Sequence, residues 1–485
     1  MKKESSLKQN FIYNIVYQIL ILILPLITVP YVSRVLGVEN IGIYSYTYSI
    51  ISYFMLIGLL GINNYGSRTI AKCRDDKEKL SKNFLGIYCI QFVMSFLMII
   101  IYTFFIAYVR EYKTIFTIQI IYLISTLFDI NWLFFGLEKF KITVTRNIFI
   151  KLISLVMVFL LVKTEEDLWK YTLIMALSTL LGQLVLFKFL KNEIVFTKIK
   201  FIDIKKHFKQ CFVLFIPVIA VSLYKIMDKT MIGLMAGVEE VGYYEQAEKI
   251  VNIPMGIITA LGTVMLPRIS NLISNGKDKK ISEYLEKSIN FMMFLAFPIC
   301  LGIIAVSGDF IPLFLGNEFE KSSIILNYLS ITLIFISFAN IIRTQYLIPK
   351  ERDKEYIISV ILGAIINFIM NMIFIPKFAS IGACFGTIAA EFVVMLYQIM
   401  AINKEIKIFK YISNVKSFFI KAIIMFLIVY IIKLIDFNSI VKVSIQVIVG
   451  GVIYSILNYK YINSLVNLKE IKQKLWSIIW KERKI

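Results

Sequence analysis

The sequence is poor in the residues that most enzymes and metal sites use. Its 485 residues include one histidine, His207, and five cysteines that are scattered along the chain. None of the cysteines stands at a metal-ligand or disulfide spacing from another (Cys73, Cys89, Cys211, Cys300 and Cys384). Metal-, thiol- and histidine-dependent catalysis are therefore excluded, and the sequence predicts neither a metal nor a cofactor. It also lacks a glycine-rich loop of the kind that cradles nucleotide phosphates.

The sequence has no stretch polar enough to form a soluble domain of ordinary size. Hydrophobic residues make up 58% of the chain, and the mean hydropathy is +0.76. A helix needs about 20 mostly apolar residues to cross a bilayer. We place fourteen such spans at residues 11–33, 41–66, 83–108, 114–136, 147–162, 168–187, 212–236, 243–266, 289–314, 323–348, 356–376, 381–402, 418–435 and 441–459. The sequence therefore predicts an all-α polytopic membrane protein with about fourteen transmembrane helices.

Basic residues are unevenly distributed between the two sides that these spans define. With the N-terminus inside, the inner segments hold roughly four times as many lysine and arginine residues as the outer loops, as the positive-inside rule requires. Adding or removing one span would mix the basic loops between the two sides. We therefore expect a multi-pass protein of a bacterial plasma membrane with both termini in the cytoplasm.

The formal net charge of +21 raises the question of nucleic-acid binding, because basic patches bind phosphate backbones. Here the basic residues lie in short loops beside the membrane, where each gains about 1 kcal/mol from anionic headgroups. The tail Tyr459–Ile485 is basic and contains Trp476 and Trp480, as is typical of an amphipathic helix on a membrane surface. We expect membrane lipids, and no nucleic acid, as partners.

A repeat at an offset of 200 residues divides the chain. Gly37–Tyr44 reads GVENIGIY and Gly237–Tyr244 reads GVEEVGYY, and each copy joins the first two spans of its half. Both copies connect an outward span to an inward one, so the halves are parallel, and transporters built in this way hold a site between two bundles. We expect a six-helix lobe at 1–205 and a second six-helix lobe at 206–403 around a central cavity. Two extra helices and a tail follow at 404–485.

Several segments in both halves carry a resemblance to a known family. They are Val35–Tyr44, Phe128–Trp132, Gly136–Phe140, Asp228–Gly233 with Gly237–Tyr244, Gln345–Pro349, and Gly382-Ala383 before Glu391. Together they resemble the polysaccharide flippases (Wzx-type) of the multidrug/oligosaccharidyl-lipid/polysaccharide exporter superfamily. The resemblance extends over almost the whole chain.

The resemblance implies both a fold and a substrate class. The fold is a twelve-helix core in two six-helix lobes with a central cavity, plus two extra helices. The substrate is a polyprenyl-diphosphate-linked oligosaccharide repeat unit, moved from the inner to the outer leaflet by alternating access. Such a unit serves the assembly of a cell-surface polysaccharide such as capsule or O-antigen. Contact with the polysaccharide polymerase machinery belongs to the same expectation.

Spans 7 and 8 carry ionisable residues at membrane depth, where one such residue costs about 2.5–3.5 kcal/mol on insertion scales. Each set is spaced i, i+3 and i+4, which places its members on one helix face. The two sets are Lys225, Asp228 and Lys229 in span 7, and Glu245, Glu248 and Lys249 in span 8. They could form internal ion pairs, Lys225–Asp228 and Glu245–Lys249, that only hold the helices together. Alternatively, they line a cavity that faces a diphosphate.

The second alternative yields a set of candidate site residues. Phosphate oxygens need cationic donors, which arginine and lysine supply. The substrate-binding candidates are Arg34, Lys225, Lys229, Lys249, Arg343, Asp129 and Asn131. The candidates for a coupling ion or for sugar contacts are Asp228, Glu248 and Glu391.

Two other functions are compatible with parts of the pattern. A cation-coupled drug or metabolite antiporter of the same superfamily would share the fold and the repeat, but an excess of acidic residues in the cavity would be typical of it. A membrane glycosyltransferase or polymerase would need catalytic carboxylates in a sizeable outer loop. The longest outer stretch, Ser307–Ser322, contains only Asp309, Glu318 and Glu320. We therefore expect a transporter and not an enzyme.

Overall fold

The computed structural model describes residues 7–195, 197–198, 200–276, 278–403, 405–406, 409–435 and 437–465. Side chains are described in these ranges except at 7–22, 216–217, 221, 223–225, 260, 263–264, 278–279 and 409–414. The side chain of Lys225 and the tail from residue 466 onward, which includes Trp476 and Trp480, therefore lie outside the described residues.

All regular elements in these ranges are helices. Their bounds are α1 (Leu7–Leu59), α2 (Ile62–Cys73), α3 (Lys77–Tyr108), α4 (Lys113–Leu127), α5 (Asn131–Gly136), α6 (Phe140–Leu161), η1 (Glu165–Asp167), α7 (Leu168–Leu190), α8 (Phe201–Ala236), α9 (Val238–Ser274), α10 (Asp278–Leu315), η2 (Asn317–Phe319), α11 (Glu320–Ile342), η3 (Arg343–Leu347), α12 (Asp353–Phe378), α13 (Ser380–Ile402), α14 (Phe409–Ile432), α15 (Ser439–Leu457) and α16 (Tyr459–Leu465).

The helices agree with the predicted spans. Among the described residues, 11 helical segments are long and apolar enough to cross a membrane. The first of these, Ile23–Cys73, contains two predicted spans, because Gly37 (φ 72°, ψ 177°) interrupts α1. The charged helices α8 and α9 have 36 and 37 residues, which is also long enough to cross. With α1 divided and these two added, about fourteen spans result, so the predicted fold class is confirmed.

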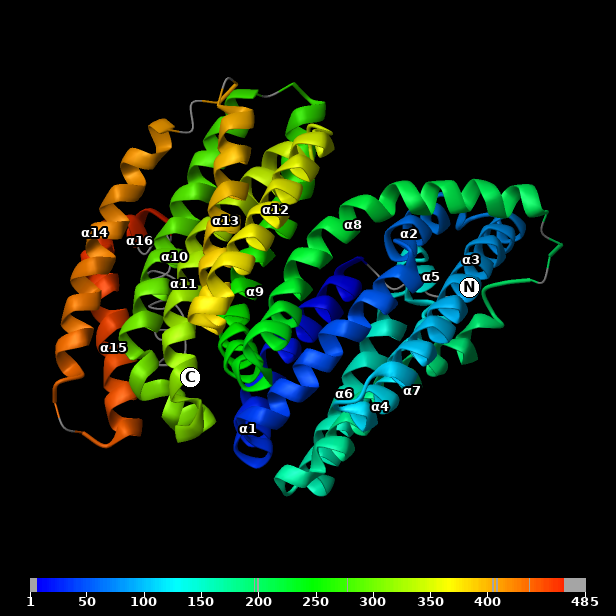
Figure 1. Cartoon of the computed structure of the whole chain (residues 1–485). Coiled ribbons are helices and arrows are strands. Elements are labelled where there is room, and N and C mark those ends of the chain that lie inside the picture. The colour runs from blue at the N-terminus through cyan, green and yellow to red at the C-terminus, as the bar shows by residue number, and fades with distance from the viewer. Residues whose placement is uncertain are drawn as a thin grey trace, which may run out of the picture.

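The helices form two lobes with an appendage (Figure 1). Helices α1–α7 make up the first lobe, and α9–α13 make up most of the second. Helices α14 and α15 pack on each other and on α10, on the side of the second lobe away from the first. We retain the boundaries 1–205, 206–403 and 404–485 as our proposed domain division.

Helix α8 connects the lobes and belongs structurally to both. It curves across the first lobe in Figure 1 and then descends into the second. Near its start, Cys211 and Phe215 are buried in an apolar cluster with Leu60 and Ile62 of the first lobe. Its later part packs on α12 and α9 of the second lobe. A movement of one lobe against the other must therefore be absorbed within α8.

The two copies of the repeat adopt the same backbone conformation. Gly37 has φ 72° and ψ 177°, and Gly237 has φ 98° and ψ 165°. A positive φ of this kind is readily adopted only by glycine. In each copy the glycine ends the first membrane span of its lobe and starts the second, so the same residue type causes the same break in both halves.

The two copies also pack directly against each other. A Cβ atom placed on Gly42 would lie 1.8 Å from the carbonyl oxygen of Val238, and one placed on Gly242 would lie 2.3 Å from that of Val38. The contact is reciprocal, as a pseudo-two-fold axis between parallel repeats requires. We call these four residues the repeat contact. It joins the lobes at the end of the bundle that we predict to face outward.

We predict that Gly42→Ala opens this end of the molecule, because a methyl group cannot share the space of the Val238 carbonyl oxygen. Gly451→Ala is the matched control, since a Cβ atom there meets no heavy atom within 4 Å. Spin labels at exposed Tyr108, at the end of α3 in the first lobe, and at exposed Leu434, just after α14 of the appendage that packs on the second lobe, report the separation of the two lobes. The distance distribution should shift to longer values for Gly42→Ala only, and equal distributions for both variants would contradict the prediction.

Candidate functional site

A cluster of charges, of which Glu245 is buried and the other three are partly buried, lies where α8 and α9 face each other. The Lys229 ammonium is 2.5 Å from a carboxylate oxygen of Glu245 and 2.7 Å from one of Glu248. Lys249 lies 3.0 Å from the other Glu245 oxygen. We call these four residues the charge cluster. Two ammonium groups and two carboxylates compensate each other, which buried charges require.

The charge cluster agrees with only part of the predicted pairing. The Glu245–Lys249 pair forms as expected. Asp228, however, lies in a different environment from Lys229 and hydrogen-bonds to α9, α12 and α13 instead. Adjacent helical residues point about 100° apart, so α8 presents Asp228 to the interior of the second lobe and Lys229 to the cluster. The side chain of Lys225 is outside the described residues.

The charge cluster borders cavities between the lobes. Two cavities of about 340 and 320 Å³ share Tyr171, Met175 and Lys249 in their walls, and we call them together the central cavity. Lys229 and Glu245 also line the larger of these two cavities. Its walls come from α1, α4 and α7 of the first lobe and from α8 and α9 of the second. The site thus lies between the lobes, as expected for parallel repeats.

Tyrosine rings line the first-lobe side of the central cavity. The ring centroids of Tyr44 and Tyr171 are 5.0 Å apart, and those of Tyr48 and Tyr122 are 5.1 Å apart. The hydroxyls of Tyr44 and Tyr122 lie 2.9 Å from each other. Tyr122 and Tyr171 were missed from the sequence, where the only signal was a tyrosine inside an apolar span. Such a surface offers both flat apolar faces and hydroxyl groups.

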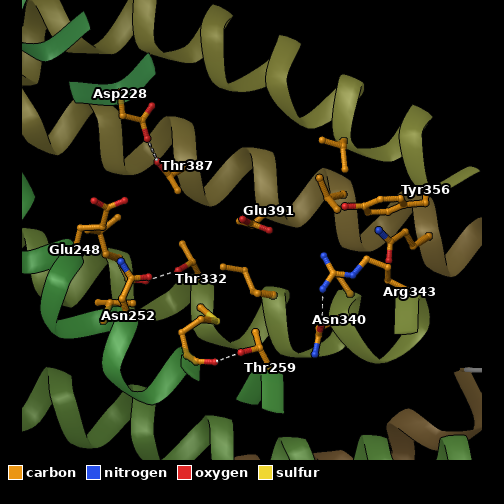
Figure 2. A pocket seen from close by; sticks show the side chains of 18 of the residues that line it. Asp228, Glu248, Asn252, Thr259, Thr332, Asn340, Arg343, Tyr356, Thr387 and Glu391 are labelled. Carbon is orange, nitrogen blue, oxygen red and sulfur yellow. Dashed lines mark hydrogen bonds between the residues drawn. The ribbon is translucent and has the colours of Figure 1, made fainter. Parts of the chain in front are cut away.

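A second polar cavity lies inside the second lobe, and all three candidates for a coupling ion or for sugar contacts, Asp228, Glu248 and Glu391, line it (Figure 2). We call it the C-lobe cavity; its volume is about 330 Å³. At one end, Asp228 accepts hydrogen bonds from the side chains of Tyr244 (2.8 Å), Thr387 (2.7 Å) and Asn371 (2.6 Å). The structure therefore brings a carboxylate and three uncharged polar groups together within a single lobe.

Glu391 and Arg343 lie further along the same cavity. Glu391 is 8% exposed and makes no hydrogen bond or ion pair with any described residue. Arg343 donates to Asn340 (2.7 Å), and its guanidinium lies 5.6 Å from the ring centroid of Tyr356. Figure 2 shows Glu391 between Asp228 and Arg343. Arg343 thus faces the C-lobe cavity and not the central one.

Glu248 connects the two cavities. Its carboxylate is paired with Lys229 in the charge cluster, and its side chain also lines the C-lobe cavity with Asp228. A change of charge in the C-lobe cavity therefore acts directly on a partner of Lys229.

The segment that carries Arg343 is anchored at the end of the second lobe that we predict to face the cytoplasm. Glu405 accepts a hydrogen bond from the Tyr346 hydroxyl and one of 2.7 Å from Arg352. The Tyr346 hydroxyl, and then Lys350 and Arg352, lower the pKa of Glu405 because they stabilise its carboxylate form. These contacts hold η3 to the end of α13.

The remaining candidates lie outside the central cavity. Asp129 and Asn131 belong to a network in the first lobe, where Asn131 donates to Asp129 (2.7 Å) and accepts from Arg146 (2.6 Å). All three line a separate cavity of about 530 Å³. Arg34 donates to the Leu313 carbonyl oxygen across the lobes (2.5 Å). Arg34 therefore joins the lobes near the repeat contact.

Comparison with known proteins identifies the family. The sequence profile described as polysaccharide biosynthesis protein matches residues 7–273, which is more than half of the chain. The chain belongs to this family. A second profile, MatE, matches residues 214–373. The resemblance that the motifs indicated, to the polysaccharide flippases of this exporter superfamily, is confirmed.

Two relatives align with 82% and 49% of the chain. The putative O-antigen transporter of Escherichia coli (strain K12) is 24% identical over 405 residues, which are 82% of this chain and 97% of that protein. The probable low-salt glycan biosynthesis flippase Agl15 of Haloferax volcanii is 25% identical over 240 residues, or 49% of this chain and 50% of that protein.

Solved structures confirm the fold. The lipid II flippase MurJ, in an inward closed conformation, gives a TM-score of 0.72 at 18% identity and covers 94% of this chain and 99% of its own. An inward-facing multidrug resistance MATE family transporter gives a TM-score of 0.55 at 15% identity, over 81% of this chain and 98% of its own. At these identities the likeness shows the fold alone.

The charge cluster predicts unequal effects of its two lysines on stability. Lys229→Ala leaves the buried carboxylate of Glu245 and the partly buried carboxylate of Glu248 without their shared partner. Lys249→Ala removes only one contact of Glu245. Breaking a buried ion pair costs about 3–5 kcal/mol, so Lys229→Ala should lower the thermal unfolding midpoint of the purified protein more than Lys249→Ala does. Exposed Lys377→Ala is the control. Equal midpoints for the two cluster variants would show that Lys229 does not hold the cluster together.

Proposed function

We propose that this chain is a flippase for polyprenyl-diphosphate-linked oligosaccharide repeat units, which it moves from the inner to the outer leaflet for surface polysaccharide assembly. One observation carries the proposal: the central cavity places paired lysines opposite tyrosine rings, between lobes that meet at the repeat contact. Ammonium groups suit phosphate oxygens, and ring faces suit the apolar faces of sugars. The names of the curated relatives, an O-antigen transporter and a glycan flippase, support the same substrate class.

Binding of the substrate proceeds by an exchange of partners. In the structure Lys229 and Lys249 are held by Glu245 and Glu248. The diphosphate oxygens replace Glu245 as the partner of the two ammonium groups, so the lysines remain compensated while the substrate is bound. The glutamates then face the sugar hydroxyls, which donate hydrogen bonds to carboxylates.

Coupling to an ion uses the C-lobe cavity. Glu248 lines the C-lobe cavity and is paired with Lys229, which lines the central cavity. A proton or metal cation that neutralises Glu248 therefore weakens its hold on Lys229 and favours the exchange. Asp228 and Glu391 are the other groups that a cation entering this cavity meets. Asp228, Glu248 and Glu391 therefore serve coupling, while Lys229 and Lys249 serve the substrate. Arg343 lies at the other end of the cavity and guides access to it.

The orientation follows from the basic loops. We propose that both termini and the segments 72–82 and 188–209 are cytoplasmic and that the repeat contact faces outward. A cysteine at Glu165 should react with a membrane-impermeant maleimide in intact cells, and one at Lys198 should react only after permeabilisation. Both positions are exposed in the structure. Labelling of Lys198→Cys in intact cells would contradict the proposed orientation.

We also propose that the protein contacts the polysaccharide polymerase machinery.

Transport itself is tested in proteoliposomes that contain a labelled polyprenyl-diphosphate oligosaccharide. Lys229→Gln and Lys249→Gln should each reduce flipping about tenfold, as expected for the loss of about 1.4 kcal/mol of substrate binding. Lys377→Gln, which removes an exposed charge that lines neither cavity, should flip at the rate of the unchanged protein. Normal flipping by both variants would show that Lys229 and Lys249 do not bind the substrate.

The alternative function is a cation-coupled drug or metabolite antiporter, which the MatE profile and the MATE-like fold favour. The same proteoliposomes distinguish the two functions. An antiporter exchanges a cationic dye against a proton or sodium gradient and leaves the labelled lipid in place. A flippase moves the lipid and does not carry the dye.

The membrane potential supplies a driving force for the proposed direction. Moving one charge across 100 mV is worth about 2.3 kcal/mol, so two diphosphate charges gain about 4–5 kcal/mol on leaving an inside-negative cell. We predict that collapsing the potential with valinomycin and potassium reduces net export. Unchanged net export would exclude the membrane potential as the driving force. It would indicate instead that an ion bound at Asp228, Glu248 or Glu391 drives export.

A further inference from the structure

A basic cavity lies apart from the sites described above, at the end of the bundle that carries the basic loops. Helices α2 and α3 and the first turns of α8 enclose it, and its volume is about 370 Å³. The residues that matter for its chemistry are Tyr65, Lys82, Asn83, Lys206, His207 and Lys209. We call it the headgroup pocket. None of these residues lines the central or the C-lobe cavity.

A hydrogen bond between two helices forms the wall of the headgroup pocket. The hydroxyl of Tyr65 on α2 lies 2.7 Å from Nδ1 of His207 on α8, and the two ring centroids are 5.8 Å apart. His207 is only 9% exposed although it is polar. When Tyr65 donates to Nδ1, the imidazole carries its proton on Nε2 and presents a donor. The single histidine of the chain is therefore held in the wall of the pocket.

The charges of the pocket leave an excess of positive charge. Lys82 is paired with Asp203 at 3.0 Å. Lys206 and Lys209 form no ion pair with any described residue, and both are exposed at the mouth of the pocket. They lie on the same helix as His207, one turn apart, so their ammonium groups can converge on one ligand. The uncompensated charge favours an anion.

We propose that the headgroup pocket binds the phosphate group of a membrane lipid. Lys206 and Lys209 supply the ammonium donors, and His207 and Asn83 supply hydrogen bonds from the pocket wall. Basic pockets on the cytoplasmic side of helical membrane proteins attract anionic headgroups. The same chemistry fits an anionic phospholipid or the diphosphate end of a polyprenyl lipid.

Because the headgroup pocket lies on α8, a ligand bound there affects how the two lobes are arranged. The pocket is formed by the part of α8 that packs on the first lobe, whereas the later part of α8 packs on the second lobe. A phosphate bound to α8 and to Asn83 of α3 strengthens the attachment of α8 to the first lobe. Since α8 must adjust when the lobes move, lipid occupancy favours one arrangement of the lobes over the other.

Native mass spectrometry of the purified full-length protein tests the proposal with two probes, a phosphatidylglycerol and a polyprenyl diphosphate. The unchanged protein should retain at least one of them, and Lys206→Gln with Lys209→Gln should weaken that binding at least threefold. The matched control is Lys198→Gln with Lys205→Gln, which removes two exposed lysines of the same segment that do not line the pocket. It should bind as the unchanged protein does.

The two probes separate the sources of the phosphate. Loss of phosphatidylglycerol binding alone assigns the pocket to a phospholipid, and loss of polyprenyl diphosphate binding assigns it to the carrier lipid. Equal retention of both probes by the pocket and control variants would overturn the proposal. Because binding is measured without transport, the result is independent of the proposed flipping, and an intact thermal unfolding midpoint shows that the pocket variant is folded.

Discussion

The close approach of the two repeat copies is the constraint on which the rest of the structure depends. Gly42 lies against Val238, and Gly242 lies against Val38, with no room for a Cβ atom at either glycine. This contact brings the two lobes together at one end of the bundle. It also fixes α8 and α9, which start or end at the second copy, opposite the first lobe. The charge cluster and the tyrosine rings are consequently placed face to face.

The charge cluster is stable only because its charges compensate one another, and the same property makes it suitable for an anionic substrate. Lys229 has two carboxylate partners, and one of them, Glu248, also lines the C-lobe cavity. A buried site with spare partners can release one and accept a phosphate without leaving a lysine unpaired. The arrangement joins substrate binding to the state of a second, acidic cavity through a single side chain.

The sequence predicted the lobes and the charged helices, because apolar span length, loop charge and an aligned repeat report these directly. Helical spacing within one helix also offered the Glu245–Lys249 pair, as one of two alternatives for these charges, and the structure contains that pair. The sequence did not predict that Asp228 lies outside the charge cluster. Side chains at i, i+3 and i+4 point over a range of directions around the helix, so they can face different neighbouring helices. Tyr171 was missed for a similar reason, since its role depends on which helix lies opposite.

The partner exchange is the central claim, and it is tested most directly by the affinity for a polyprenyl diphosphate without sugars, measured on purified Glu245→Gln. This variant removes the group that competes with the diphosphate for Lys229 and Lys249. The account predicts that Glu245→Gln binds the lipid more tightly than the unchanged protein, while Lys229→Gln binds it more weakly. Weaker or unchanged binding by Glu245→Gln would contradict the account, because the glutamate would then not be the partner that the phosphate replaces.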